Sequence, residues 1–229
     1  ARVDDPDGVS AVQLKYRVDP SATFNTLAMS HLGGGVYGAS LTGQPSGKIV
    51  AFYISATDSN SASMTFPENP TNRECLIRWG DVQYGSDFGT YRFWLSKTNM
   101  DTWTARAPLA DEELDMTLVY PDEDRVIYNM GIRYRGSPFI RTWYSEPGTG
   151  INSYVISPPK DDLLLGSDEL NLDTLEPWEG RDETRLRERT SFWIATEMGL
   201  SYCYQRLVHV YLNGVQHGDV YADTHHVDS

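Results

Sequence analysis

Only one long stretch of this sequence, residues 181–200, has helical periodicity, and the rest consists of short alternating runs divided by turn residues. This pattern predicts a mainly β fold with one principal helix, because period-two alternation is typical of half-buried strands. From residue 11 to about residue 79 the turn signals recur roughly every 8–12 residues, the spacing found in small sandwiches. We therefore expect an immunoglobulin-like or fibronectin-like β-sandwich over residues 1–85.

The predicted domain boundary lies in the segment DVQYGSDFG (residues 81–89), which is polar, rich in Gly and Asp, and without periodicity. The second unit, residues 86–229, is expected to be an α+β domain. Strict alternation over residues 126–135 predicts a strand, and Asn213-Gly214 predicts a tight hairpin between two later strands. Residues 160–174 are expected to form a loop with a short apolar kernel.

The principal helix is expected to span residues 182–198, with Asp182 as its N-cap and Gly199 at its C-terminal end. One face of this helix is apolar, and the face opposite to it carries Glu188 among small and aromatic residues. The Glu188 carboxylate is therefore expected to point towards the protein interior and to need a partner. Pairing of Glu188 with a neighbouring arginine on the surface is the alternative. The face expected to pack on a sheet contains Leu186, Thr190, Trp193, Ile194 and Met198.

The chain of 229 residues has a formal net charge of −13. Such acidity disfavours nucleic acid and anionic membranes as partners. No apolar run approaches the ~20 residues that a membrane-spanning helix needs, so membrane insertion is not expected. The two cysteines, Cys75 and Cys203, are interpreted as buried thiols, with a disulfide between domains as the alternative. A start without Met and an end directly after a strand-like run favour a piece of a longer protein.

No segment has the spacing of an established metal site. The acidic turns at residues 4–8 and 121–125 could offer oxygens to calcium, but neither fits an EF-hand loop, and solvated turns are the favoured interpretation. His225 and His226 are adjacent on a predicted strand, so at most one of them would face a common site. No metal ligand is therefore predicted.

Four motifs follow one another in the second unit: Arg133, Arg135 and Gly136, then Leu170–Leu172, then Arg187 and Glu188, and finally Leu212–Gly214 with Gly218–Tyr221. Together they resemble the small lobe of the CotH-type spore-coat kinase family over roughly residues 90–226. The order of predicted elements is also that of a kinase-like small lobe: three strands, a helix, a strand, an Asn-Gly turn and a strand. The first unit is similar to the immunoglobulin-like modules that precede this region in large secreted bacterial surface proteins.

The resemblance implies a secreted or cell-surface bacterial protein from a family that transfers phosphoryl groups from ATP to protein hydroxyls. In that reading Glu188 holds the lysine that contacts the phosphates, and Lys160 is the candidate for this lysine. Arg133 or Arg135 could supply the phosphate-binding charge instead. The metal-binding and base carboxylates belong to the larger lobe, which is expected to lie outside this sequence. ATP and Mg²⁺ are therefore implied only for a full-length parent, with no cofactor for this chain.

Two functions from different classes follow. The chain is either the non-catalytic piece of a CotH-like kinase, or a structural or adhesive extracellular protein that uses the fold without catalysis. The second function implies self-association or binding to other surface proteins, through sheet edges or aromatic patches. A weaker alternative is carbohydrate binding by Trp103, Trp143 and Trp178, because aromatic rings stack on sugars.

Overall fold

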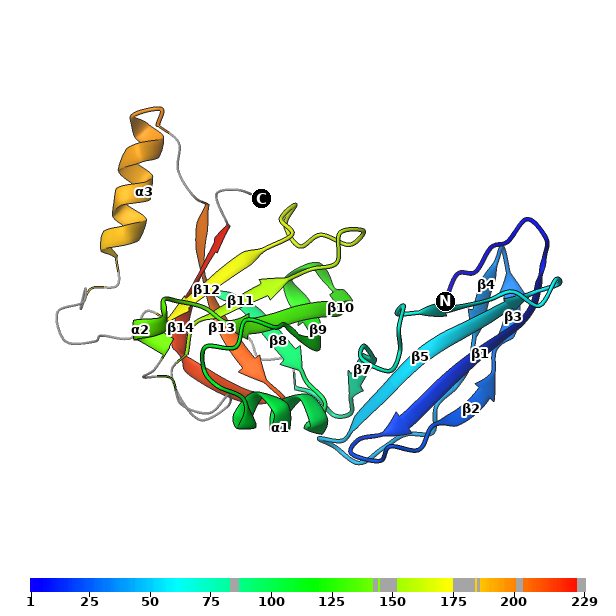
Figure 1. Ribbon diagram of the computed structural model, residues 1–229. Coiled ribbons are helices and arrows are strands. Elements are labelled where there is room, and N and C mark those ends of the chain that lie inside the picture. The colour runs from blue at the N-terminus through cyan, green and yellow to red at the C-terminus, as the bar shows by residue number, and fades with distance from the viewer. Residues whose placement is uncertain are drawn as a thin grey trace.

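The computed structural model describes residues 1–82, 87–141, 144, 152–174, 184, 186–200 and 204–225. Within these ranges, fourteen strands, three α-helices and one short 3-10 helix form a sheet unit and a barrel unit that lie side by side (Figure 1). The mainly β fold predicted from the sequence is confirmed. The predicted boundary between residues 85 and 86 lies outside the described residues.

The first unit is built on one five-stranded sheet. Strand β5 is central, with β1 and then β2 on one side and with β6 and β7 sharing its other edge. Strands β3 and β4 form a separate hairpin, so the unit differs from the two facing sheets expected of a sandwich. The strands are β1 (Val9–Val18), β2 (Asn25–Ala28), β3 (Ser30–Gly33), β4 (Val36–Gly38), β5 (Ile49–Asp58), β6 (Ser63–Phe66) and β7 (Cys75–Arg78).

The second unit is a seven-stranded barrel that closes in the order β10-β11-β12-β14-β13-β8-β9. All neighbouring strands are antiparallel except β8 and β13, which run parallel. A 3-10 helix, Pro121–Glu123, joins β9 to β10, and the short helix α2 (Pro138–Arg141) follows β10. The strands are β8 (Gly89–Trp94), β9 (Leu114–Tyr120), β10 (Arg125–Tyr134), β11 (Tyr154–Ser157), β12 (Leu170–Thr174), β13 (Gln205–Leu212) and β14 (Val215–His225).

The barrel is filled by aromatic and aliphatic side chains. Helix α1 (Lys97–Ala105) begins after Ser96, whose hydroxyl accepts the backbone N–H of Asn99 as an N-cap. The helix brings Trp103 into the core, where it is 1% exposed. The Trp103 ring lies 5.1 Å from that of Tyr134 and 5.6 Å from that of Tyr154, measured between centroids. The interior is thus a packed aromatic core.

The predicted Asn-Gly hairpin is confirmed and belongs to the barrel. Asn213 and Gly214 have φ values of 48° and 84°, the left-handed pair that a type I′ turn requires. The Asn213 side chain also accepts the backbone N–H of Leu95 and donates to its carbonyl, both at 3.0 Å. The turn that connects β13 to β14 is therefore anchored to the segment that connects β8 to α1.

The segment expected to be a loop, residues 160–174, contains a strand. Its last five residues form β12, which pairs with β11 on one side and β14 on the other. Leu170 and Leu172 point into the core, and Leu164 earlier in the segment is also buried. The prediction of an apolar kernel in this segment is thus correct, whereas the prediction that the whole segment is a loop was wrong.

The principal helix, α3 (Arg187–Glu197), extends away from the barrel (Figure 1), and none of its residues is buried. The predicted core face was wrong: Leu186 and Trp193 are 52% and 62% exposed. Phe192 and Ala195 on the opposite face are the half-buried positions. The helix therefore exposes the face that was expected to pack on a sheet, and its opposite face is half-buried only at these two positions.

The C-terminal end of α3 follows the prediction. Gly199 has a φ of 68°, and its N–H bonds the carbonyl of Thr196. The N–H of Leu200 bonds the carbonyl of Ala195, which completes a Schellman motif. The predicted N-cap, Asp182, lies outside the described residues.

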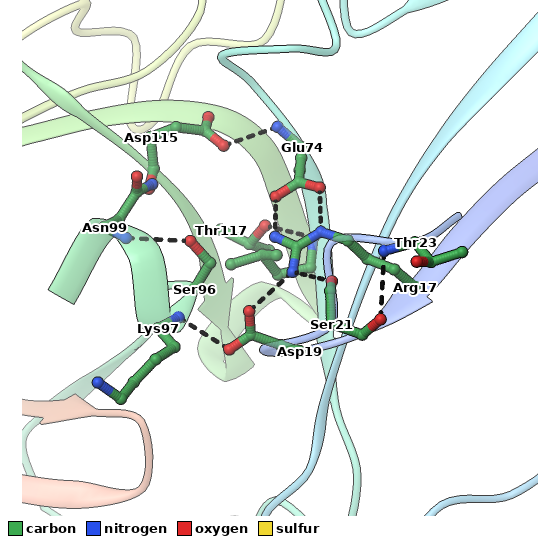
Figure 2. Close-up of polar contacts among 11 residues, drawn as sticks. Arg17, Asp19, Ser21, Thr23, Glu74, Ser96, Lys97, Asn99, Asp115 and Thr117 are labelled. Atoms are coloured by element: carbon green, nitrogen blue, oxygen red, sulfur yellow. Dashed lines mark hydrogen bonds and ion pairs between the residues drawn. The ribbon is translucent and has the colours of Figure 1, made fainter. Parts of the chain in front are cut away.

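Arg17 on β1 is the centre of the polar contacts that join the two units (Figure 2). Its guanidinium donates to both carboxylate oxygens of Glu74 and, at 2.9 Å, to Asp19. Asp19 in turn accepts the backbone N–H of Lys97 at the start of α1 at 2.8 Å. On the barrel side, Asp115 of β9 accepts the backbone N–H of Glu74 at 2.8 Å. These bonds couple the sheet unit to both α1 and the barrel wall.

Apolar packing reinforces this junction on both faces of the sheet. On one face, the Tyr128 ring of β10 packs edge-on against Phe52 at 5.6 Å between centroids. On the other face, Leu76 lies in a buried cluster with Trp94 and Val119 of the barrel. Barrel residues thus cover the sheet where a sandwich would place its second sheet. The short hairpin of β3 and β4 cannot do this, because every residue of β3 is exposed.

The junction predicts a pH dependence of stability centred on Asp115. Burial raises the pKa of Asp115 to about 7, with a contribution in the same direction from the nearby Glu74 carboxylate. The hydrogen bond from the Glu74 N–H and the charge of Arg73 act in the opposite direction and lower this pKa. The folded protein therefore binds a proton that the unfolded chain, with an ordinary Asp pKa of about 3.9, releases earlier. The stability contribution is present below about pH 4 and is lost as pH rises to about 7.

We expect Asp115→Asn to be more stable than the wild type above pH 7, by about 1–3 kcal/mol, and to lose this advantage near pH 4. The amide oxygen of Asn can still accept the Glu74 N–H, so the geometry of the junction is retained. Urea unfolding of both proteins at a series of pH values measures the difference. A difference that stays constant from pH 4 to pH 8 would show that Asp115 does not titrate in this range.

Candidate functional site

Glu188, the predicted lysine-holding carboxylate, lies on the first turn of α3 and is exposed. Its Oε2 accepts a hydrogen bond from the side-chain amide of Gln205 at 2.9 Å, and the same amide group contacts Thr224 Oγ1 at 3.3 Å. These contacts tie the start of α3 to the start of β13 and the end of β14. The prediction of an inward, sheltered carboxylate was therefore wrong, and its observed partner is an amide.

Lys160 lies in the segment between β11 and β12. It is exposed and lines a groove of about 580 Å³ between the two units. The groove is bordered by Phe66 and Arg73 from the first unit and by Tyr128 and Glu113 from the barrel. Lys160 is thus grouped with residues of the unit junction, and the groove contains no residue of α3.

Arg133 lies on β10 and Arg135 directly follows the last residue of that strand, and each lies near carboxylates. Arg135 is ion-paired with Asp173 of β12. Arg133 lies 3.9 Å from Asp111 and 3.7 Å from Glu169. The positive charges of Arg133 and Arg135, which were predicted to bind phosphates, are therefore already paired with acidic side chains on the barrel surface.

No hydrogen bond or ion pair among the described residues joins any two of the four predicted site residues. Phosphoryl transfer depends on bringing a cation, a carboxylate that orients it and the phosphates together. In this structure, Glu188 lies on α3 and Lys160 in the junction groove, while Arg133 and Arg135 lie at the end of β10 and directly after it. The sequence identified residues of suitable chemistry, but the fold places them apart.

The densest polar cluster of the barrel was not predicted. Arg206 on β13 donates to Asp223 on β14 at 3.0 Å, and to the hydroxyls of Tyr91 and Tyr120. Tyr91 in turn donates its hydroxyl to Asp223, which is 0% exposed. The guanidinium also lies over the rings of Tyr91 and Tyr120, 5.2 and 4.9 Å from their centroids.

Arg206 and Asp223 form a largely buried ion pair with a structural role. Burial raises the pKa of Tyr91 well above its ordinary value, and the Asp223 charge adds to this. The phenol therefore stays protonated and donates, while arginine stays charged at all working pH values. The protonated phenol and the charged guanidinium both donate to the buried Asp223 carboxylate, and these contacts hold β8, β13 and β14 together.

Three carboxylates bring the predicted acidic turn at residues 4–8 close to the end of β5. Asp5, Asp7 and Asp58 each offer one oxygen within 4.8 Å of the others. Calcium takes six to eight oxygen ligands, so three exposed or half-exposed carboxylates do not by themselves make a site. In the other predicted turn, Asp122 and Glu123 lie near arginines, as surface ion pairs do.

The remaining candidates divide between buried and undescribed residues. Trp103 is buried in the barrel core, which removes it from the proposed sugar-stacking set. Cys75 is a buried free thiol, as the first interpretation of the cysteines expects. Trp143, Trp178, Cys203 and His226 lie outside the described residues.

Among the described residues, no helix is long and apolar enough to cross a bilayer. In comparisons with known proteins, the sequence matched no protein-family model and no curated protein.

Proposed function

We propose that this chain is the small-lobe part of a CotH-like, kinase-related region of a secreted bacterial surface protein, and that it serves as a structural scaffold without transferring phosphate. The order of elements supports the relationship: β10, β11, β12, α3, β13 and β14 follow the order of a kinase-like small lobe, with the Asn213-Gly214 turn in the matching place. The resemblance of the four sequence motifs supports it independently.

The separation of the candidate site residues is the observation that best supports a structural role. A working site would need Glu188 to hold a cation beside the phosphates. Here Glu188 contacts Gln205, and Arg135 contacts Asp173. Both contacts would have to break, and α3 would have to move, before these residues could act on one ligand.

The junction between the units supports the same conclusion. Buried apolar contacts and the Arg17 network join the sheet unit to the barrel, so a force applied to one unit passes directly to the other. A scaffold benefits from such coupling, whereas a catalytic pair of domains commonly moves about its interface. We therefore assign the chain to the structural or adhesive class.

Thermal unfolding with and without nucleotide tests this proposal. We expect the same Tm in millimolar ATP with MgCl₂ as in MgCl₂ alone. A ligand at about 100 times its Kd stabilises a protein by about 2.7 kcal/mol, which for a chain of this size raises Tm by several degrees. Even moderate nucleotide binding would therefore be detected.

Two variants of α3 make the result specific. If ATP with MgCl₂ raises Tm, if Glu188→Gln removes the rise and if Glu197→Gln keeps it, the proposal of a non-catalytic scaffold is wrong and the kinase interpretation of Glu188 is supported. Incubation with radiolabelled ATP and a protein substrate mixture provides the second readout. Incorporation of label that depends on Glu188 would lead to the same conclusion.

A further inference from the structure

Helix α3 has an exposed apolar face centred on Trp193. Trp193 is 62% exposed, and Leu186 and Leu200, seven residues before and after it, are 52% and 55% exposed. Residues seven apart on a helix differ by only ~20° around its axis, so Leu186 and Trp193 lie on one line, and Leu200 follows just beyond the helix end. Contiguous exposed apolar groups of this kind mark interaction surfaces.

Two opposite charges flank Trp193 at equal distances. Arg189 lies four residues before it and Glu197 four residues after it, each about one turn away, and both are exposed. Within the part of the chain that the structure describes, neither side chain has an ion-pair partner. The face thus carries an apolar centre, a cation towards the helix start and an anion towards the helix end.

We propose that α3 is a contact surface between two copies of this chain, paired with their helices antiparallel about a two-fold axis at Trp193. In this arrangement each residue is level with the residue equally far on the other side of Trp193 in the second copy. Arg189 is then level with Glu197 of the second copy, and this pair occurs twice. Leu186 is level with Leu200, and the two Trp193 rings meet at the axis. This proposal rests on the structural role above and names the partner.

The charges on α3 favour a second copy of this chain as the partner, with the two helices antiparallel. A net charge of −13 repels a second copy, so association requires local opposite charges at the contact. Parallel helices would place Arg189 beside Arg189 and Glu197 beside Glu197, which is repulsive, whereas antiparallel helices pair them favourably. A two-fold contact is self-complementary, as the symmetric placement of these residues requires.

The size of the face sets the strength of the contact. An 11-residue helix is about 16 Å long. One such face cannot reach the ~800 Å² per partner of a standard stable interface. We therefore expect a weak dimer whose population rises with protein concentration, with a Kd in the micromolar to millimolar range.

Sedimentation velocity over this concentration range, at physiological ionic strength, tests the proposal by charge reversal. The wild type is expected to shift from monomer to dimer. Glu197→Arg and Arg189→Glu each place like charges level across the axis, so each should weaken association by about tenfold or more. The double variant Arg189→Glu/Glu197→Arg restores opposite charges and should return Kd to within about threefold of the wild-type value.

Arg187→Glu is the matched control for Arg189→Glu, since it makes the same charge change at an exposed position about 120° around the helix from Trp193, and it should keep the wild-type Kd. Circular dichroism of each variant checks that the helix content is unchanged. A wild type that stays monomeric up to millimolar concentration overturns the proposal. So does association that Glu197→Arg leaves unchanged, or a double variant that remains monomeric. The nucleotide experiment is independent of these outcomes, so the scaffold role can stand or fall separately.

Discussion

Replacement of Arg206 by Met should destabilise the barrel by about 3–5 kcal/mol, because it leaves the buried Asp223 carboxylate without its cation. The guanidinium also accounts for hydrogen bonds to the hydroxyls of Tyr91 and Tyr120, which Met cannot make. Methionine keeps much of the volume of arginine, so the expected loss comes from the polar contacts. Urea unfolding at neutral pH measures it directly.

Two further variants separate this effect from a general loss of charge. Arg133→Met removes an arginine from a surface ion pair at 3.7 Å and should cost no more than about 1 kcal/mol. The double variant Arg206→Met/Asp223→Leu removes both buried charges and should lose less than the sum of its single changes. A loss below about 1 kcal/mol for Arg206→Met would contradict the assignment of the cluster as a structural ion pair.

Replacement of Trp103 by Ala should also cost about 3–5 kcal/mol, by removing the side chain that α1 contributes to the barrel core. The rings of Tyr134 and Tyr154 would lose their contacts with the indole and line a cavity. Trp103→Phe retains an aromatic ring and should lose less. Thermal or urea unfolding measures both losses.

Trp193→Ala provides the matched comparison, since it deletes the same side chain from an exposed position. Measured at a protein concentration low enough for monomers, it should change stability by no more than about 0.5 kcal/mol. Equal losses for Trp103→Ala and Trp193→Ala would mean that α3 packs on the protein in solution. Both the described exposure of α3 and the pairing proposed for it would then be wrong.

Much of the local structure was predictable because it depends on neighbouring residues. The Asn213-Gly214 turn has left-handed backbone angles that few other pairs adopt, and Gly199 ends α3 for the same reason. Period-two alternation located β10, and the cluster of apolar residues before Thr174 located buried side chains in the segment of β12. In each case the signal lies within about ten residues of sequence.

The position of α3 was not predictable by the same reasoning. Its periodicity correctly shows an apolar face containing Leu186 and Trp193, but periodicity does not say what covers that face. The sequence-based interpretation assumed a sheet of the same chain, whereas the structure leaves the face exposed. The prediction for Glu188 failed for a similar reason, because the aromatic and small residues on its face do not say what covers that face either.

The pairing of Arg206 with Asp223 was hidden by an irregular register. The turn sets Leu212 opposite Val215 and Val210 opposite His217, but the register shifts before Val208, which lies opposite Tyr221. Counting back from the turn without this shift would place Arg206 opposite Tyr221 rather than Asp223. A bulge changes which residues face each other without leaving a clear sequence signal, so the main polar cluster could be found only in the structure.

The parallel pairing of β8 with β13 has a consequence for folding of the nascent chain. Strand β8 is the first of the barrel to be synthesised, yet its parallel neighbour, from Val208 to Leu212, comes almost last. Until that neighbour emerges, one edge of β8 has no strand to bond, and the barrel cannot close. A ladder between such distant segments raises the contact order, which slows the search for the native topology. We expect the sheet unit to form early and the barrel to close late, with an aggregation-prone edge exposed in between.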